Sequence, residues 1–222
     1  MQPRSALLLG ATGLVGGHCL ELLLEDVAYR EVTVVGRRTL SREHPKLRQV
    51  VVDFNRLAES ADRFGAQDVF CCLGTTLRTA GSQEAFRRVD LEYPRAAAEI
   101  AVRRGAERFL LVSAMGADPG SRIFYNRVKG EVEAAVRALP FHEVVILRPS
   151  LLLGERAERR PGEMLAQRVF GPFSDLLVGP LRKYRPVHGR TVARAMVRLA
   201  KEGGEGVRVV ESDRIQALGS TA

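Results

Sequence analysis

Tyr125 and Lys129 are the residues whose types and spacing best suit chemistry. They stand four positions apart in Tyr125-Asn126-Arg127-Val128-Lys129, which places both side chains on one face of a helix. A lysine ammonium beside a tyrosine phenol stabilises the phenolate form. The tyrosine would then act as a general acid–base that exchanges a proton with a carbonyl oxygen while hydride reaches the carbon. The same ammonium is suited to bind the ribose of a nicotinamide cofactor.

Ser113 is the third candidate catalytic residue. It follows an apolar run and ends the strand that we expect over residues 108–112. In an open α/β sheet, ligands bind at the carboxyl ends of the strands, so the Ser113 hydroxyl would meet a substrate oxygen there. A turn or capping role explains an isolated serine equally well. The order of a glycine loop, a strand-end serine and Tyr-x-x-x-Lys is more specific than any one part.

A loop with three glycines spaced three apart begins the chain's first expected strand–helix unit. The first glycine permits a tight turn, the second lets the backbone approach a pyrophosphate, and the third lets the helix pack close to the strand. Free N–H groups at the helix start then attract phosphates. An ordinary glycine turn is the alternative. The candidate cofactor-binding residues of this segment are Gly10, Thr12, Gly13, Leu14, Val15 and Gly16.

Two arginines follow the second expected strand, in Val35-Gly36-Arg37-Arg38. Enzymes that use NAD usually carry Asp or Glu at this place, where it binds the ribose 2′-hydroxyl. Gly36 leaves room for a 2′-phosphate, and the guanidinium groups of Arg37 and Arg38 can bind it through paired hydrogen bonds. The pattern therefore favours NADP over NAD, with two solvated surface arginines as the alternative.

Further candidate cofactor contacts follow the third and fourth expected strands. Asp53 and Phe54 could frame the adenine, although Asp53 suits a helix cap or a turn nearly as well. Gly74 would let the backbone pass close to a cofactor ribose, with Leu73 and Thr75 on either side. Gly-Thr-Thr is also an ordinary loop sequence, so this segment alone decides little.

Apolar, β-branched runs alternate with amphipathic helical patterns along the chain. We expect strands over residues 6–9, 31–35, 49–52, 68–73, 108–112, 143–147 and 207–210, and helices near 14–24, 57–64, 83–103, 124–139 and 192–201. This alternation predicts the α/β class: a doubly wound parallel sheet, Rossmann-like and NAD(P)-binding, in three α/β/α layers. Residues 1–222 should form one domain. Residues 151–188, rich in Gly, Pro and Arg, should be a small substrate-side elaboration.

Composition excludes several classes of function. The longest apolar runs fall short of the roughly 20 residues that span a bilayer, so no membrane span is expected. The net charge of +8 would suit a polyanion, but the arginines are spread along the chain, and we do not expect nucleic-acid binding. Three cysteines are too few for a disulfide framework, and Cys71 and Cys72 lie in an apolar run. The four histidines have no ligand spacing, so we predict no metal. We also expect a cytoplasmic location and a monomer or homodimer.

These motifs resemble those of the short-chain dehydrogenases/reductases, of the extended or atypical type. More closely, the chain is similar to a small group that includes a vertebrate Tat-interacting, oxidoreductase-like protein and its bacterial relatives. The similarity covers nearly the whole chain, to residue 219. The segments that carry it are residues 9–16, 35–38 and 70–76, Val89-Asp90, residues 125–133 and Arg160-Pro161-Gly162-Glu163.

The resemblance implies roles for individual residues. Ser113, Tyr125 and Lys129 match the catalytic serine, tyrosine and lysine of the family. The three glycines would cradle the dinucleotide, and the arginine pair after the second strand would hold the 2′-phosphate. The resemblance also implies that Pro149, in Arg148-Pro149-Ser150, passes near the nicotinamide. Many extended members have a longer C-terminal substrate region than this chain.

Two functions remain open at this point. The first is an NADP-dependent oxidoreductase that transfers hydride to or from a small carbonyl or alcohol substrate. The second is a non-catalytic, NADPH-sensing regulatory protein, which the short substrate region favours. The complete set of Ser113, Tyr125 and Lys129 favours the enzyme, because a sensor need not keep all three.

Overall fold

A seven-stranded parallel sheet forms the centre of the computed structural model, which describes residues 3–154 and 179–220. The strand order is β3-β2-β1-β4-β5-β6-β9, and every neighbouring pair is parallel. The order reverses between β1 and β4, which confirms the doubly wound topology. The strands of this sheet are β1 (Arg4–Leu9), β2 (Tyr29–Gly36), β3 (Leu47–Val51), β4 (Asp68–Cys71), β5 (Arg108–Val112), β6 (Glu143–Arg148) and β9 (Gly206–Glu211).

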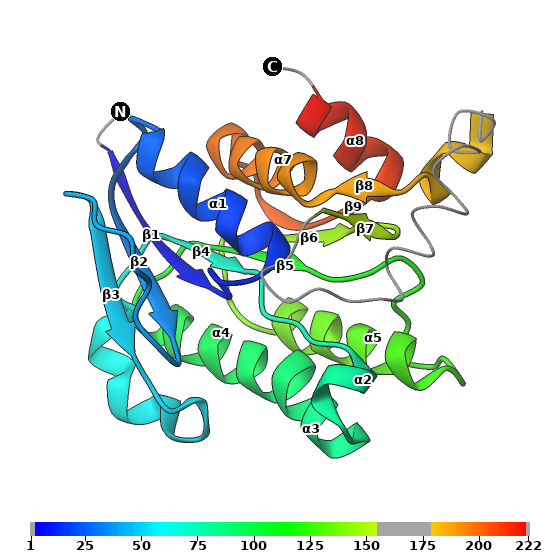
Figure 1. Cartoon of the computed structure of the whole chain (residues 1–222), viewed down its shortest axis with the longest axis horizontal. Helices are drawn as coiled ribbons and strands as arrows, with labels where there is room; N and C mark the ends of the chain where they lie inside the picture. The colour runs from blue at the N-terminus through cyan, green and yellow to red at the C-terminus, as the bar shows by residue number, and fades with distance from the viewer. Residues whose placement is uncertain (1–2, 155–178, 221–222) are drawn as a thin grey trace.

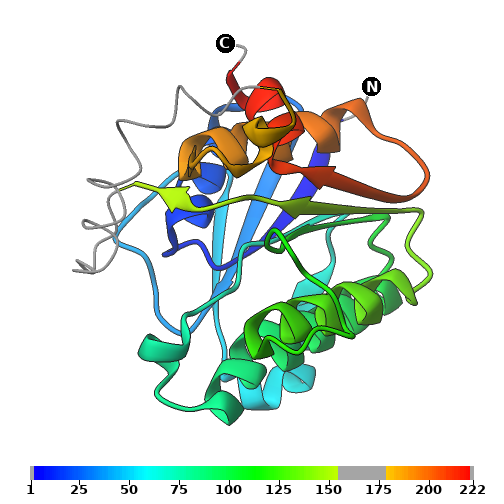
Figure 2. The same ribbon diagram turned by 90° about the vertical axis from the view of Figure 1, so that its right-hand side faces the viewer.

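Helices cover both faces of the sheet, so the predicted three layers are confirmed (Figure 1, Figure 2). One face carries α1 (Leu14–Glu25), α7 (Gly189–Glu202) and α8 (Ser212–Ser220). The other carries the 3-10 helix η1 (Phe54–Phe64), α2 (Leu77–Ala80), α3 (Gln83–Arg87), the π-helical turn η2 (Arg88–Glu92), α4 (Tyr93–Arg103) and α5 (Phe124–Arg137).

Strand β1 shows why the sheet is buried on both sides. Ala6 and Leu8 point into the core under α1 and α7, whereas Leu7 and Leu9 point into the core under η1, α4 and α5. All four side chains are fully buried. Because successive strand residues face opposite sides, a continuous apolar run needs a helical layer on each face.

The predicted elements differ from the observed ones in several places. Strand β4 ends at Cys71 rather than at residue 73, where the backbone of Cys72 and Leu73 passes directly beside Gly10 of the glycine loop. The helix expected near 57–64 is a kinked 3-10 segment, and the one near 83–103 is two α-helices, α3 and α4, joined by the π-helical turn η2. Helix α8 was not predicted; it is short and mixes Ser, Asp, Arg and Gln with the buried Ile215 and Leu218.

Part of the predicted substrate-side elaboration is described. Residues 151–154 and 179–188 form β7 (Leu152–Leu153), the 3-10 helix η4 (Gly179–Tyr184) and β8 (Val187–His188), and the two short strands pair in parallel. Residues 155–178 lie outside the described residues. In the described part of the chain, no helix is both long and apolar enough to cross a membrane. Nor do residues 3–154 and 179–220 hold a group of three or more His, Cys, Asp or Glu side chains placed to bind a metal ion.

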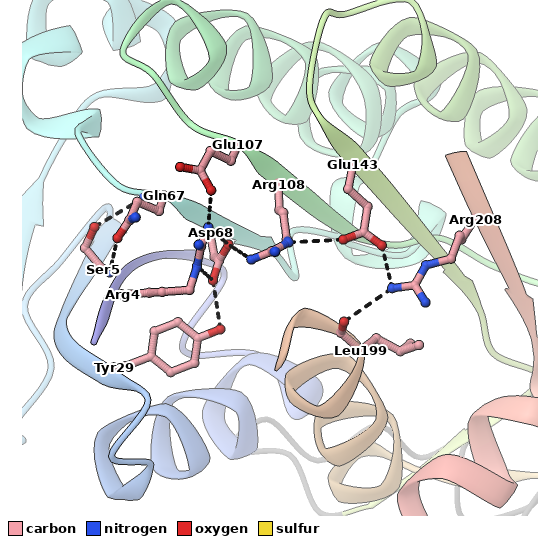
Figure 3. A network of polar contacts seen from close by, with 10 residues as sticks. All are labelled: Arg4, Ser5, Tyr29, Gln67, Asp68, Glu107, Arg108, Glu143, Leu199 and Arg208. Atoms are coloured by element: carbon pink, nitrogen blue, oxygen red, sulfur yellow. Dashed lines mark hydrogen bonds and ion pairs between the residues drawn. The ribbon is translucent and has the colours of Figure 1, made fainter. Parts of the chain in front are cut away.

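A row of charged side chains joins the amino ends of the central strands (Figure 3). Asp68, Arg108 and Glu143 are the first residues of β4, β5 and β6, and the strand register places them side by side. Asp68 accepts hydrogen bonds from Arg4 at 2.8 and 2.9 Å, and from Arg108 at 3.2 Å. The buried Tyr29 hydroxyl donates to the same carboxylate at 3.0 Å.

Glu143 continues this row toward the edge of the sheet. Its carboxylate lies 3.1 Å from Arg108 Nε and 2.5 Å from Arg208 Nη2. Both Asp68 and Glu143 are fully buried. A buried carboxylate is tolerated when cations and donors surround it, and loss of its partners leaves an uncompensated charge. The row therefore fixes the relative positions of five strands at the edge opposite the expected site.

We expect Asp68→Ala to lower the free energy of unfolding by about 3–5 kcal/mol, because it leaves Arg4 and Arg108 without their shared buried carboxylate. Urea unfolding followed by circular dichroism measures the change. Glu107→Ala is the matched control, since Glu107 also binds Arg4 but is 47% exposed, and it should cost less than about 1 kcal/mol. Equal losses in the two variants would contradict the prediction.

Candidate functional site

The glycine loop brings the carboxyl ends of β1 and β4 together. Gly10 has φ +83°, a conformation that favours glycine, and a Cβ there would lie 2.5 Å from the carbonyl oxygen of Cys72. A Cβ on Gly16 would overlap the carbonyl oxygen of Gly10. The first and third glycines therefore act as predicted, one in the turn and one in the contact between α1 and β1.

The start of α1 leaves its backbone donors unoccupied. Gly13 is the residue before the helix, and neither a capping side chain nor an acidic residue occupies the first turn. Unpaired N–H groups and the positive end of the helix dipole suit the phosphates of a dinucleotide. Thr12 and Gly13 are exposed, whereas the side chains of Leu14 and Val15 are buried. Leu14 and Val15 would thus contact a cofactor through their backbone alone.

Arg37 and Arg38 are both exposed directly after β2. Within the described residues, neither has a hydrogen bond or an ion pair, and no carboxylate stands at the position of Gly36. Asp53 begins η1, and its carboxylate accepts a hydrogen bond from the Asn55 N–H at 2.9 Å. The capping role proposed for Asp53 is confirmed, and contact with an adenine stays a prediction.

Phe54 and Pro149 are both buried beside the expected cofactor face. The Phe54 ring packs on Tyr93 with 5.2 Å between ring centroids. Pro149 follows β6, and its carbonyl oxygen accepts the N–H of Met115 at 3.0 Å. Their roles toward adenine and nicotinamide stay predictions.

Lys129 lies in a buried ion pair that the sequence did not reveal. Its Nζ is 2.8 Å from Oδ1 of Asp90, and the two side chains are 7% and 0% exposed. The other oxygen of Asp90 accepts the N–H of Thr75 at 2.8 Å. A Cβ on Gly74 would lie 3.4 Å from Asp90 and 3.7 Å from Lys129 Nζ. The loop after β4, predicted to pass a cofactor ribose, therefore runs directly over the Lys129–Asp90 pair.

Burial and the neighbouring Asp90 and Tyr125 determine the charge state of Lys129. Burial alone would lower its pKa, but the Asp90 carboxylate and Tyr125 outweigh burial, and the pKa of Lys129 is raised. A group with a raised pKa keeps its proton throughout the physiological range. Lys129 thus presents a fixed positive charge beside Tyr125, as the spacing on α5 predicted.

Tyr125 is half-buried at the start of α5. Its ring packs against Phe86, with 5.6 Å between centroids. Its hydroxyl has no partner among the described residues. The loop before α5 approaches this helix closely, since a Cβ on Gly130 would overlap the backbone at Asp118 and Pro119. The contact with Phe86 holds the Tyr125 ring in place, and the hydroxyl oxygen is available to a ligand.

Ser113 donates its hydroxyl proton to a buried carboxylate. Ser113 Oγ lies 2.6 Å from Oε1 of Glu133, which is itself 3% exposed. Arg148 binds both oxygens of that carboxylate, at 3.0 and 2.7 Å, and Arg137 binds Oε2 at 3.1 Å. This pairing raises the pKa of Arg148, with the hydrogen bond to Glu133 as the largest cause. Ser113 therefore offers lone pairs, and not its proton, in the absence of a ligand.

Asp90 and Glu133 are the residues that sequence reasoning missed. A signal existed for Glu133, because it stands four residues after Lys129 and eight after Tyr125, on the same face of α5. Asp90 lies 39 residues from Lys129 along the chain, and only the fold brings them together. Cys71 is a core residue as expected, and burial raises the pKa of its thiol to about 12. Cys72 is only partly buried and packs against the core under α1 and α7.

Comparison with protein families identifies the family of this chain. Residues 10–171 match the model of a family described as NAD(P)H-binding. The chain belongs to this NAD(P)H-binding family. The match begins at Gly10 and includes all three predicted catalytic residues.

Named relatives of this NAD(P)H-binding chain extend over almost its full length. Protein HTATIP2 of Rattus norvegicus is 41% identical over 99% of this chain and 90% of its own length. Protein FMP52, mitochondrial, of Debaryomyces hansenii is 32% identical over 89% of this chain and 88% of its own. The predicted resemblance to the group around the Tat-interacting protein is confirmed.

Solved structures show the same fold at low identity. A Bordetella bronchiseptica enzyme, WbmH, in complex with NAD+ superimposes with a TM-score of 0.69 at 17% identity, over 94% of this chain and 75% of that one. A short-chain dehydrogenase family protein from Francisella tularensis gives 0.67 at 12% identity, over 96% and 99%. The NAD(P)H-binding chain thus has the Rossmann-like fold of short-chain dehydrogenases.

We expect Asp90→Asn to make NADPH binding pH-dependent. Without the carboxylate charge, burial lowers the pKa of Lys129, so the ammonium is lost as the pH rises. Between pH 6.5 and 9, the NADPH affinity of the variant should fall about tenfold more than that of the wild type. A tenfold change in affinity equals about 1.4 kcal/mol, the energy of one pKa unit. Fluorescence titration at several pH values measures this.

Glu131→Gln is the control for this experiment. It removes a carboxylate from the same helix, where Glu131 pairs with Arg87 at 2.7 Å rather than with Lys129. Its pH dependence should follow the wild type. An Asp90→Asn variant whose affinity also follows the wild type at every pH would show that Asp90 does not control the charge of Lys129.

Proposed function

We propose that this protein is an NADP-dependent oxidoreductase of the short-chain dehydrogenase type, acting on a small carbonyl or alcohol substrate. The observation that carries the proposal is the buried, charged Lys129 beside a Tyr125 hydroxyl that has no partner among the described residues. Lysine charge next to a free phenol is the arrangement that general acid–base chemistry at a carbonyl oxygen requires.

The residues present fit a bound dinucleotide. A side chain at Gly10 or Gly16 would collide with neighbouring backbone atoms, so both positions of the loop require glycine. The first turn of α1 keeps its N–H groups free for phosphates. A nicotinamide, when bound, supplies or accepts the hydride. Tyr125 then gives its phenolic proton to the carbonyl oxygen, or takes the proton back from an alcohol. Lys129 stabilises the phenolate that this transfer leaves.

The arginine pair after β2 supports NADP rather than NAD. Arg37 and Arg38 are exposed, lack partners among the described residues, and follow a glycine in place of a carboxylate. A guanidinium binds a phosphate dianion through two parallel hydrogen bonds. No group of this kind is needed for a ribose 2′-hydroxyl.

One observation favours the second function, a non-catalytic NADPH sensor. The Ser113 proton is directed at Glu133, so this serine cannot donate to a carbonyl oxygen unless the hydroxyl turns. A protein that only senses NADPH does not need that proton. A sensor requires that NADPH changes the affinity for a partner, which separates it from the enzyme.

The setting of the protein is also proposed. We expect a monomer or homodimer in the cytoplasm that binds a small molecule and no nucleic acid. The fungal relatives carry a mitochondrial location in their names, so fractionation of the native cells is the direct test of location.

We expect the wild type to oxidise NADPH with at least one substrate from a panel of aldehydes, ketones and quinones. Tyr125→Phe should lower turnover about 10²–10⁴-fold, the usual contribution of a general acid, while NADPH still binds. Absorbance of NADPH at 340 nm measures turnover. NADPH binding without any oxidation across the panel would favour the sensor. Equal turnover in wild type and Tyr125→Phe would remove Tyr125 from the chemistry.

Cofactor choice is tested separately with Arg37→Gln and Arg38→Gln combined. We expect NADPH affinity to fall at least tenfold, since hydrogen bonds to charged groups contribute about 1.5–3 kcal/mol, while NADH affinity changes little. Fluorescence titration with both dinucleotides measures the ratio. Arg42→Gln, in the same loop but paired with Glu21, is the control. Parallel losses for NADPH and NADH would contradict 2′-phosphate recognition.

A further inference from the structure

A second pocket lies apart from the glycine loop, between α1 and α7, which run side by side (Figure 1). Its volume is about 360 Å³, within the range of small-molecule sites. Four basic side chains contribute to its wall. The residues that line it are His18, Leu153, Gly154, His188, Gly189, Arg190, Thr191 and Arg194.

Leu14 separates this pocket from the dinucleotide loop. A Cβ on Gly154 would lie 2.5 Å, and one on Gly189 2.6 Å, from the Leu14 side chain. Both glycines line the pocket, so Leu14 packs directly behind its wall. The backbone of the same residue begins α1 on the side expected to bind pyrophosphate. The pocket is therefore a neighbour of the cofactor site and not a part of it.

Within the described residues, the two arginines of the pocket have no carboxylate partner. Arg190 and Arg194 have neither an ion pair nor a hydrogen bond there, and none of the described lining residues is acidic. By contrast, Arg198, one turn further along α7, pairs with Glu202 at 2.9 Å. His18 does contact a carboxylate, because its Nδ1 lies 3.4 Å from Glu21.

This arrangement is unfavourable for an empty pocket. Arg190 and Arg194 are four residues apart on one helix, where like charges repel. Both lie in the first two turns of α7, near the positive end of its dipole, and the first turn contains no acidic residue. An anion in the pocket would remove both penalties at once.

We infer that this pocket binds the phosphate group of a small molecule. Two guanidinium groups match the charge of about −2 on a phosphate, whereas a carboxylate would neutralise only one of them. Ring N–H groups of His18 and His188 and the Thr191 hydroxyl add donors for the remaining oxygens. The inference does not depend on the proposed oxidoreductase function, because no catalytic residue lines the pocket.

Calorimetric titration tests this inference on the whole protein, saturated with NADP+ so that the dinucleotide site is filled. The probes are inorganic phosphate and glycerol 3-phosphate. We expect one or both to bind, and Arg190→Gln or Arg194→Gln to weaken binding at least tenfold. Arg198→Gln is the matched control, since it removes the same charge from the same helix outside the pocket, and it should leave the affinity unchanged.

The two probes also separate the sources of the phosphate. Tighter binding of glycerol 3-phosphate supports a phosphorylated metabolite as the ligand, and equal or tighter binding of inorganic phosphate supports the free ion. No binding of either probe at millimolar concentration overturns the inference. Equal loss of affinity in all three arginine variants also overturns it, because that result would reflect net charge alone.

Thermal unfolding gives an independent test, because the Tm difference between Arg190→Gln and the wild type should change sign when phosphate is added. In phosphate-free buffer, the exposed Arg190→Gln should raise the Tm by about one degree, because it relieves repulsion between the two arginines. In millimolar phosphate, the wild type should gain stability and the variant should not. A variant that is less stable than the wild type in both buffers would contradict uncompensated charge at the pocket.

Discussion

The parallel sheet depends on a row of buried charges at its amino edge. Asp68 and Glu143 are fully buried, and the arginines that neutralise them come from the neighbouring strands β1, β5 and β9. The pairs exist only in one register, because Asp68, Arg108 and Glu143 must stand side by side. A shift of one residue would bury an unpaired carboxylate and turn the apolar side chains to the wrong face. The amino edge thus fixes the relative positions of β1, β4, β5, β6 and β9.

At the opposite edge, close backbone approach replaces charge pairing. Gly10 lies against the carbonyl of Cys72, and Gly16 lies against Gly10, so the backbone segments after β1 and β4 approach too closely for a side chain at either glycine. The buried Lys129–Asp90 pair lies at this edge and has a single carboxylate for its cation. Asp68 at the amino edge has two arginines and a tyrosine hydroxyl as partners. Asp68 thus has several partners from the protein itself, whereas Lys129 at the carboxyl edge has one carboxylate partner among the described residues.

Sequence patterns predicted the sheet well because the relevant signals are local. Each of the seven expected strands is an apolar run of the kind that a doubly covered sheet requires, and each one is present. The glycine loop and the Tyr125–Lys129 spacing are also local. The helix α8 has a weak pattern, and it packs through tertiary contacts with α7 rather than by strong periodicity. Its existence could not be predicted from sequence for that reason.

The sequence predicted the proximity of site residues only where those residues lie on the same helix. Tyr125, Lys129 and Glu133 share a face of α5, so their proximity follows from spacing. The partners that set their chemistry come from elsewhere: Asp90 from the π-helical turn and Arg148 from β6. No local pattern links these pairs, because the topology of the whole sheet brings them together. The sequence could name the catalytic candidates but not the state of their protons.

The proton of Ser113 shows why that state matters. Glu133 is held between two arginines and accepts the Ser113 hydroxyl at 2.6 Å. An ionised carboxylate has no proton to donate, so the direction of this hydrogen bond is fixed. Ser113 can accept from a substrate hydroxyl without any rearrangement, whereas donation to a carbonyl requires that the bond to Glu133 break. Ser113 is therefore better matched to an alcohol than to a ketone in the ground state, and a reductase would need carbonyl binding strong enough to turn this one hydroxyl.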